Sequence, residues 1–159
     1  MSEIILRRAT ANDECSIFEW RNAAETRRYA FNPDVVAWKD HVRWFRDSLA
    51  RTDRHLLIGE LDNQPIGVLR YDVVNEVAEV SIYLVPGCGG RGLGTALLKE
   101  GTAWAARHLP QVTTLSARIL PDNIASRKSF AKAGYVESSG VFKYHIFPDT
   151  IVDEPKVKK

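Results

Sequence analysis

The feature that most constrains this chain is a glycine-dense segment at residues 84–98, which separates a strand pattern from a helix pattern. Before it, Val80, Ile82 and Leu84 alternate with polar residues, which is the period of a strand. The glycines leave backbone N–H groups uncovered and allow positive φ angles, and the following helix adds free amides and its positive dipole end. The segment therefore predicts a turn that binds phosphate, with a pyrophosphate favoured. One face of the helix would carry Leu93, Leu97, Gly101, Trp104 and His108.

Two common phosphate-binding loops fit this segment poorly. A Walker loop is excluded, because no Gly-Lys-Ser/Thr closes the turn. Gly87, Gly89 and Gly92 satisfy the spacing G-x-G-x-x-G of a dinucleotide fold, but that match is weak in a stretch so rich in glycine. The dinucleotide fold also needs a carboxylate at the end of the next strand, and the expected strand at residues 113–119 contains none.

A better fit is the order strand, Val-Pro, then Gly-Gly-Arg-Gly-Leu-Gly. This resembles the acetyl-coenzyme A (acetyl-CoA) loop of the Gcn5-related N-acetyltransferase (GNAT) family, written Q/R-x-x-G-x-G/A. Gly92 and Gly94 occupy its two small positions, and Gly89 stands where Gln or Arg is usual. The resemblance implies that Leu84 and Val85 pair with pantetheine, where their strand diverges from residues 113–119. It also implies that the pyrophosphate binds Gly89, Gly90, Arg91, Gly92, Leu93, Gly94 and Thr95.

A second segment, residues 122–135, resembles a later motif of the family, N-x-x-A followed by an aromatic residue and then G-F/Y. Asn123 is a good N-cap for a short helix, and Gly134 stands where a left-handed C-terminal glycine belongs. The resemblance implies that Asn123, Ser126 and Phe130 lie at the cofactor. In many relatives the position of Phe130 is a tyrosine that protonates the leaving thiolate, which phenylalanine cannot do. The acid would then be another group or water.

The order of elements along the chain agrees with the family's α+β fold, a mixed and mostly antiparallel sheet of six to seven strands flanked by about four helices. The 159 residues suffice for one sizeable core. Residues 1–147 are predicted to form one acetyltransferase domain, and residues 148–159 a polar tail. A helix is expected over residues 37–51, with Trp38, Val42, Phe45 and Leu49 as its core stripe.

Composition excludes several other classes of protein. The net charge of +2 argues against a nucleic-acid partner. Two cysteines do not make a disulfide framework, and the first residues lack the apolar run of a signal peptide. No segment approaches the ~20 apolar residues of a membrane span. We therefore expect a cytoplasmic protein with no membrane partner and no metal site.

Candidate catalytic residues lie on the strand before the glycine segment. Period-2 alternation places Glu79, Ser81 and Tyr83 on one face. Glu79 is either the general base for the incoming amine or an exposed, ion-paired residue, and Ala78-Glu79 matches the position of the base in several relatives. Tyr83 is either the missing acid or a half-buried strand tyrosine.

The N-terminal third is rich in aromatic residues and hydrogen-bond donors. It contains Trp20-Arg21-Asn22, a downstream Arg28, and His41 followed by Trp44-Phe45. This order resembles the opening of N-acetyltransferases that act on nucleotide-linked amino sugars, as in pseudaminic acid pathways. Aromatic faces can stack on a base or sugar, Arg28 could pair with a diphosphate, and His41 could bond the sugar or act as a base. The acceptor site predicted from this resemblance consists of Trp20, Arg21, Asn22, Arg28, His41 and Trp44.

Other functions stay open at this stage. The acceptor could instead be a protein N-terminus or another small amine. Phe130 and Gly89 are also compatible with a module that binds coenzyme A (CoA) and no longer catalyses. The sequence leaves the oligomeric state open, with a homodimer among the options.

Overall fold

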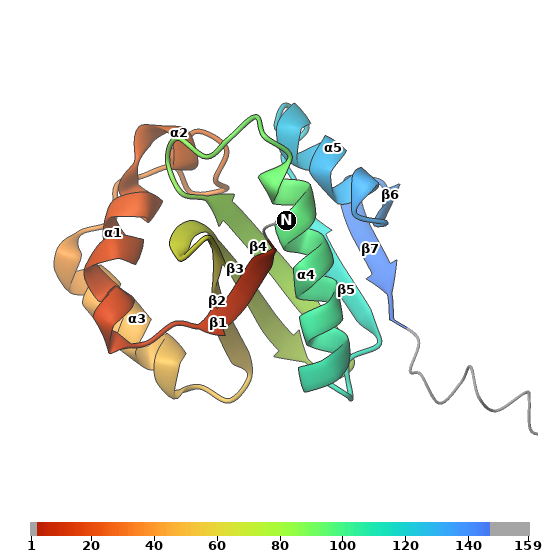
Figure 1. Cartoon of the computed structure of the whole chain (residues 1–159), viewed down its shortest axis with the longest axis horizontal. Helices are drawn as coiled ribbons and strands as arrows, with labels where there is room; N and C mark the ends of the chain where they lie inside the picture. The colour runs from red at the N-terminus through yellow and green to blue at the C-terminus, as the bar shows by residue number, and fades with distance from the viewer. Residues whose placement is uncertain (1–2, 147–159) are drawn as a thin grey trace, which may run out of the picture.

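The computed structural model describes residues 3–146, which form one seven-stranded sheet with helices on both faces (Figure 1). The predicted tail at residues 148–159 lies outside the described residues. The strand order is β1–β2–β3–β4–β5–β7–β6, and only the β4–β5 pair is parallel. The strands are β1 (Ile4–Arg8), β2 (Arg54–Leu61), β3 (Gln64–Val74), β4 (Val77–Leu84), β5 (Thr114–Arg118), β6 (Val136–Ser138) and β7 (Val141–His145).

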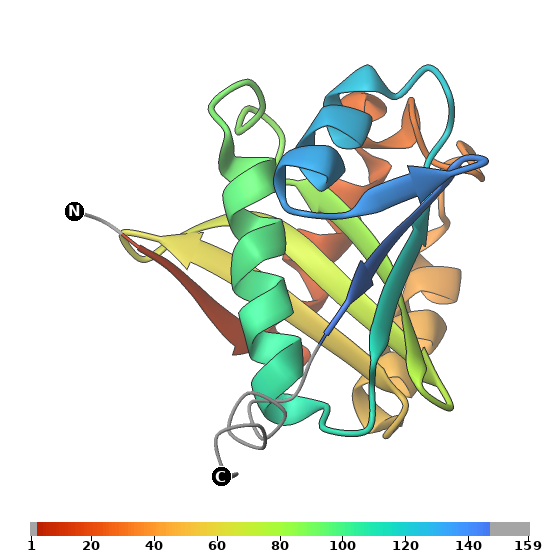
Figure 2. The same cartoon turned by 90° about the vertical axis from the view of Figure 1, so that its right-hand side faces the viewer.

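The helices divide between the two faces of the sheet. Figure 2 shows α4 and α5 in front of the sheet and the three N-terminal helices behind it. This confirms the predicted α+β fold, with seven strands and five α-helices among the described residues. The helices are α1 (Glu14–Asn22), α2 (Ala24–Arg27), α3 (Trp38–Ala50), α4 (Leu93–His108) and α5 (Ile124–Lys132). None of the helices within residues 3–146 is long and apolar enough to cross a membrane.

The start of α1 is fixed by a partly buried ion pair. Asp13, the N-cap of α1, is 8% exposed and accepts two hydrogen bonds of 2.9 Å from the Arg7 guanidinium on β1. The Asp13 carboxylate also accepts from the Thr10 backbone N–H at 2.8 Å. These bonds join α1 to the edge of the sheet, so the side chains of α1 have a fixed direction relative to the strands.

The buried face of α3 differs from the predicted stripe. Phe45 is buried as expected, but Trp38 is 44% exposed and Leu49 is 38% exposed. The helix instead buries His41 and Ser48. Both polar groups have partners, since His41 Nε2 bonds the Glu14 carbonyl at 2.8 Å and the Ser48 hydroxyl accepts from Arg54 at 3.0 Å. The apolar pattern alone misplaced the stripe because partners on distant elements made burial of these polar groups acceptable.

Candidate active site

The cleft lies at the point where β4 and β5 separate. Their parallel pairing ends at Glu79 opposite Ser116, whereas β4 stays paired with β3 as far as Leu84 opposite Gly67. The edge of β4 that faces β5 is therefore unpaired beyond Glu79, and Figure 2 shows the two strands diverging there. The gap opens into a cleft of about 560 Å³. Its walls come from α1, α2, the 29–36 segment, α3, β2, β3, β4, the glycine loop, β5 and α5.

The glycine loop leads from β4 into α4 as the sequence predicts. Gly87, Gly90 and Gly92 all have positive φ angles, and Gly92 is the N-cap of α4 with φ 74°. No side chain caps this helix, and its first backbone bond runs from Ala96 N–H to the Gly92 carbonyl at 3.2 Å. The preceding amides of α4 have no carbonyl one turn back, as at any helix N-terminus. The loop thus presents main-chain N–H donors to an anion, as a pyrophosphate requires.

The first turn of α4 packs against α5. Asn123 caps α5 by accepting a hydrogen bond from the Ser126 backbone N–H at 3.3 Å, which confirms its predicted capping role. A Cβ added at Gly94 would lie 3.2 Å from the Ser129 hydroxyl, so the glycine allows the two helices to approach closely. Phe130 is 2% exposed and packs edge-on against Tyr135, with one edge at the cleft.

Glu79 stands at the fork between the two strands. Its side chain is 56% exposed, and its Oε2 lies 4.0 Å from Arg118 Nε on β5. An ion pair this long and exposed contributes little and holds the carboxylate loosely. Glu79 therefore lines the cleft as a solvated carboxylate beside the unpaired edge of β4.

Tyr83 lies two pleats further along the same face of β4. Burial raises the pKa of its phenol well above the ordinary value, against a smaller lowering influence of Arg21 and Arg70. The phenol therefore keeps its proton at neutral pH and is available as a donor. The register places Ser81, between Glu79 and Tyr83, opposite Arg70 on β3.

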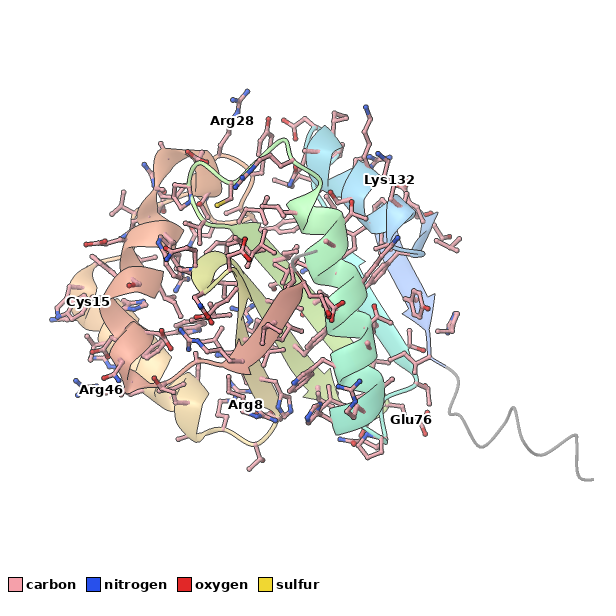
Figure 3. All side chains as sticks on the ribbon, viewed as in Figure 1. Arg8, Cys15, Arg28, Arg46, Glu76 and Lys132 are labelled. Atoms are coloured by element: carbon pink, nitrogen blue, oxygen red, sulfur yellow. The ribbon has the colours of Figure 1, made fainter. Side chains whose placement is uncertain are left out.

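The structure brings only part of the predicted acceptor site to the cleft. Arg21 and Trp44 line it, with the guanidinium 4.9 Å from the centre of the indole ring. Trp20 packs against the core between α3 and the sheet. The Asn22 amide exchanges two 2.9 Å hydrogen bonds with the main chain of Val36, so it fixes the segment before α3. Arg28 is exposed, is not part of the cleft wall, and extends outward from the end of α2 (Figure 3).

His41 is not at the cleft, contrary to the prediction that it contacts an acceptor. Its side chain is fully buried between α1 and α3, stacked on Phe45 with 5.6 Å between ring centres. Because a carbonyl can only accept, the bond to Glu14 requires a proton on Nε2, and Nδ1 has no partner in the described part of the chain. Burial lowers the His41 pKa. The residue is thus a neutral core histidine. Although His41 and Trp44 are three residues apart on one helix, only Trp44 faces the cleft.

The sequence analysis missed residues that line the cleft. Arg70 of β3, Arg118 of β5 and Phe31 before α3 all contribute to its wall. Arg70 carried one available signal, because an arginine within a largely apolar strand needs a buried partner or a ligand. Phe31 carried none, since nothing in the local pattern shows which way an irregular segment folds. Within residues 3–146, no group of three or more His, Cys, Asp and Glu side chains is arranged to hold a metal ion.

Comparison with known proteins agrees with this geometry. A family model described as "Acetyltransferase (GNAT) domain" matches residues 3–136, so the chain belongs to the GNAT acetyltransferase family. The chain is 30% identical over 142 residues to the "Putative phosphinothricin acetyltransferase YwnH" of Bacillus subtilis, covering 83% of each. It is 29% identical over 154 residues to the L-2,4-diaminobutyric acid acetyltransferase of Nocardia farcinica, covering 91% of this chain and 74% of the relative.

A solved structure confirms the fold independently. The aminoglycoside acetyltransferase AAC(6')-Ib in complex with coenzyme A and kanamycin superimposes with a TM-score of 0.80 at 18% identity, over 90% of this chain and 95% of that one. Fold, family and relatives together define an acetyl-CoA-dependent N-acetyltransferase that acts on amines. Neither relative is named for a nucleotide-linked amino sugar, so the comparisons add nothing to the predicted pseudaminic-acid type.

Proposed function

We propose that this enzyme acetylates a primary amine of a small molecule by direct transfer in a ternary complex, with Glu79 as general base and Tyr83 as general acid. The observation that carries the proposal is the placement of both side chains on one face of β4, where it separates from β5. One group is a solvated carboxylate and the other a buried phenol that keeps its proton. These are the two protonation states that the reaction requires.

The residues around the gap between β4 and β5, which we call the donor half of the cleft, fit acetyl-CoA. The main chain of Leu84 and Val85 would pair with the pantetheine arm along the unpaired edge of β4. Asn123 and Ser126 lie at the start of α5, Phe130 lies in its second half, and all three line the cleft. We propose that the main-chain donors for the pyrophosphate are those of Gly89, Gly90, Arg91, Gly92, Leu93, Gly94 and Thr95.

The chain's own groups would then move two protons. Attack by a neutral amine forms the N–C bond and breaks the C–S bond, which leaves a proton on nitrogen and a negative charge on sulfur. Glu79 takes the proton from nitrogen, directly or through water, and Tyr83 returns one to the thiolate. Tyr83 would thereby supply the hydroxyl that a tyrosine at the position of Phe130 supplies in many relatives. Binding both substrates in one cleft supplies a large further part of the rate.

A small amine is the acceptor class that the relatives favour, since phosphinothricin and 2,4-diaminobutyric acid are the compounds in their names. Of the residues predicted for a nucleotide-linked amino sugar, Arg21 and Trp44 reach the cleft. Arg28, the predicted diphosphate contact, is directed away from it. A small amine is therefore favoured over a nucleotide-linked amino sugar as the acceptor.

The test is thiol release from acetyl-CoA with a panel of amines, measured for wild type and Glu79→Gln. We expect Glu79→Gln to lower kcat/KM at neutral pH by roughly 10²–10⁴-fold, the range for loss of a general base, and to change the acid limb of the pH–rate profile. The matched control is Glu76→Gln. Glu76 is an exposed carboxylate in the turn before β4, at the end of the strand that is far from the glycine loop (Figure 3). Near-wild-type activity with an unaltered acid limb would show that Glu79 is structural. Binding of acetyl-CoA without turnover of any amine would instead indicate a non-catalytic module.

A further inference from the structure

Three arginines surround Trp44, one of the residues that line the cleft. The guanidinium carbons of Arg21, Arg54 and Arg70 lie 4.9, 5.6 and 5.7 Å from the centre of the Trp44 ring. They come from α1, β2 and β3, so the cluster forms only in the folded chain. We call these three residues the arginine cluster.

The arginine cluster has one carboxylate for three cations. Asp72 accepts from Arg54 Nε at 2.6 Å and from Arg70 Nε at 3.0 Å. Arg21 has no ion pair with any carboxylate of residues 3–146. Its guanidinium instead lies against the ring of Trp44. Burial and the nearby Arg70 both lower the Arg21 pKa, which means that the positive charge is poorly solvated there. A half-buried cation without a counter-ion is unfavourable unless a ligand supplies the anion.

The arginine cluster also lies close enough to Glu79, the proposed base, for one small acceptor to contact both. Arg70 donates to the Ser81 hydroxyl at 3.2 Å, and Ser81 is one pleat away from Glu79 on the same face. Residues i and i+2 of a strand are separated by about 7 Å. Arg21 and Arg70 thus line the same cleft as Glu79, with cations at one part of the wall and a carboxylate at another.

We propose that the acceptor carries a carboxylate in addition to its amine, and that Arg21, supported by Arg70, binds this carboxylate against the face of Trp44. The inference rests on the proposed function and names its substrate class as amino acids rather than simple amines. A planar guanidinium fork matches a carboxylate in two hydrogen bonds, which favours this anion over a neutral hydroxyl or amide. The remaining acids of the cleft wall, Glu25, Asp34 and Glu79, suit a zwitterion better than a multiply charged phosphate ester.

The experiment compares acceptors that differ only in the carboxylate. The probes are L-2,4-diaminobutyrate, L-ornithine and L-lysine, their carboxamides, and the diamines 1,3-diaminopropane, 1,4-diaminobutane and 1,5-diaminopentane. We measure kcat and KM for each, and equilibrium binding by calorimetry in the presence of CoA. We expect the wild type to prefer at least one amino acid over its carboxamide and its diamine by about 10- to 100-fold in kcat/KM, the range for a hydrogen bond to a charged group.

Arg21→Gln should then remove that preference, chiefly through KM, and leave the carboxamide and diamine values nearly unchanged. Arg21→Lys should restore part of it, because the charge returns without the planar fork. Arg28→Gln, on the exposed end of α2, is the control and should retain the full preference.

The outcomes separate the inference from the proposed function. Turnover of diamines as well as amino acids, with no preference lost in Arg21→Gln, would overturn the inference while leaving the acetyltransferase activity intact. Equal losses on the acid and its carboxamide would show that Arg21 only supports the fold, and would also overturn it. Selective binding of an amino acid in calorimetry without turnover would support the carboxylate site and contradict the proposed function.

Discussion

The two halves of the cleft are built from different parts of the chain. The proposed donor half consists of main chain: the unpaired edge of β4, the glycine loop and the first amides of α4. The proposed acceptor half consists of side chains that converge from separate elements, among them Arg21, Trp44, Arg70 and Tyr83. Main-chain donors survive substitution of the residues that carry them, whereas each side-chain contact depends on one residue type. The donor half should therefore be sensitive to backbone conformation, and the acceptor half to side-chain identity.

The largest effect is expected in the donor half, for Gly92→Asp. Gly92 has φ 74°, which an L side chain rarely adopts, and aspartate adds a negative charge at the proposed pyrophosphate position. Acetyl-CoA affinity should fall by more than about 100-fold, equivalent to about 2.7 kcal/mol or more, as measured by calorimetry.

Gly140→Asp is the matched control for this change. Gly140 has φ 82° in the turn between β6 and β7, away from the cleft wall, and nothing lies within 4 Å of its added Cβ. Gly140→Asp should strain the backbone to a similar extent as Gly92→Asp and leave the affinity for acetyl-CoA unchanged. If both variants bind acetyl-CoA equally well while circular dichroism shows intact folds, the glycine loop is not the donor site.

The same contrast explains what the sequence could predict. The glycine loop, the Asn123 cap and the left-handed Gly134, with φ 103°, are local patterns, and the structure confirms the conformation of each. The acceptor half depends on which face of α3 is buried, and this was decided by polar partners from distant segments, such as the Glu14 carbonyl for His41. Arg70 carried a local signal as an arginine in a largely apolar strand, but the cluster to which it belongs forms only when α1, β2 and β3 bring three arginines together. The roles of Glu79 and Tyr83 are still predictions.

Tyr83→Phe tests whether the acceptor half depends on a single hydroxyl. If the phenol protonates the thiolate, kcat should fall by about 100-fold, the lower end of the range for a general acid, with little change in acetyl-CoA affinity. Tyr71→Phe is a matched control, because Tyr71 is a buried strand tyrosine on the opposite face whose hydroxyl has no partner among the described residues. Equal kcat values for the two variants would assign the proton to water.

His41→Phe should separate support of the acceptor half from contact with the acceptor. The variant keeps an aromatic ring in the core but leaves the Glu14 carbonyl without its donor, which should cost about 1–3 kcal/mol of unfolding free energy at pH 8. The kinetic constants should stay within about twofold of wild type, since His41 does not line the cleft.

The pH dependence of this variant has a defined sign. Burial lowers the His41 pKa below its ordinary value of 6.5, so the unfolded chain binds a proton first as the pH falls. Wild type should therefore lose stability as the pH falls below about 6.5, while His41→Phe lacks this contribution. Denaturant unfolding at pH 8 and pH 5.5 should show the difference between the two proteins narrowing at the lower pH. A constant difference would mean that His41 titrates alike in both states.

The smallest effect is expected for Arg28→Ala, and it bears on how far the acceptor half extends. Arg28 is exposed at the end of α2, with its guanidinium 5.1 Å from the Tyr29 ring, and it forms no part of the cleft wall. Its removal should change neither KM for the acceptor nor acetyl-CoA affinity by more than about twofold, because a ground-state contact that does not exist cannot be lost. The measurement should include a UDP-linked amino sugar beside the small amines. If that sugar is acetylated well and Arg28→Ala raises its KM alone, the acceptor half extends as far as Arg28 and the nucleotide-sugar hypothesis replaces the amino acid one.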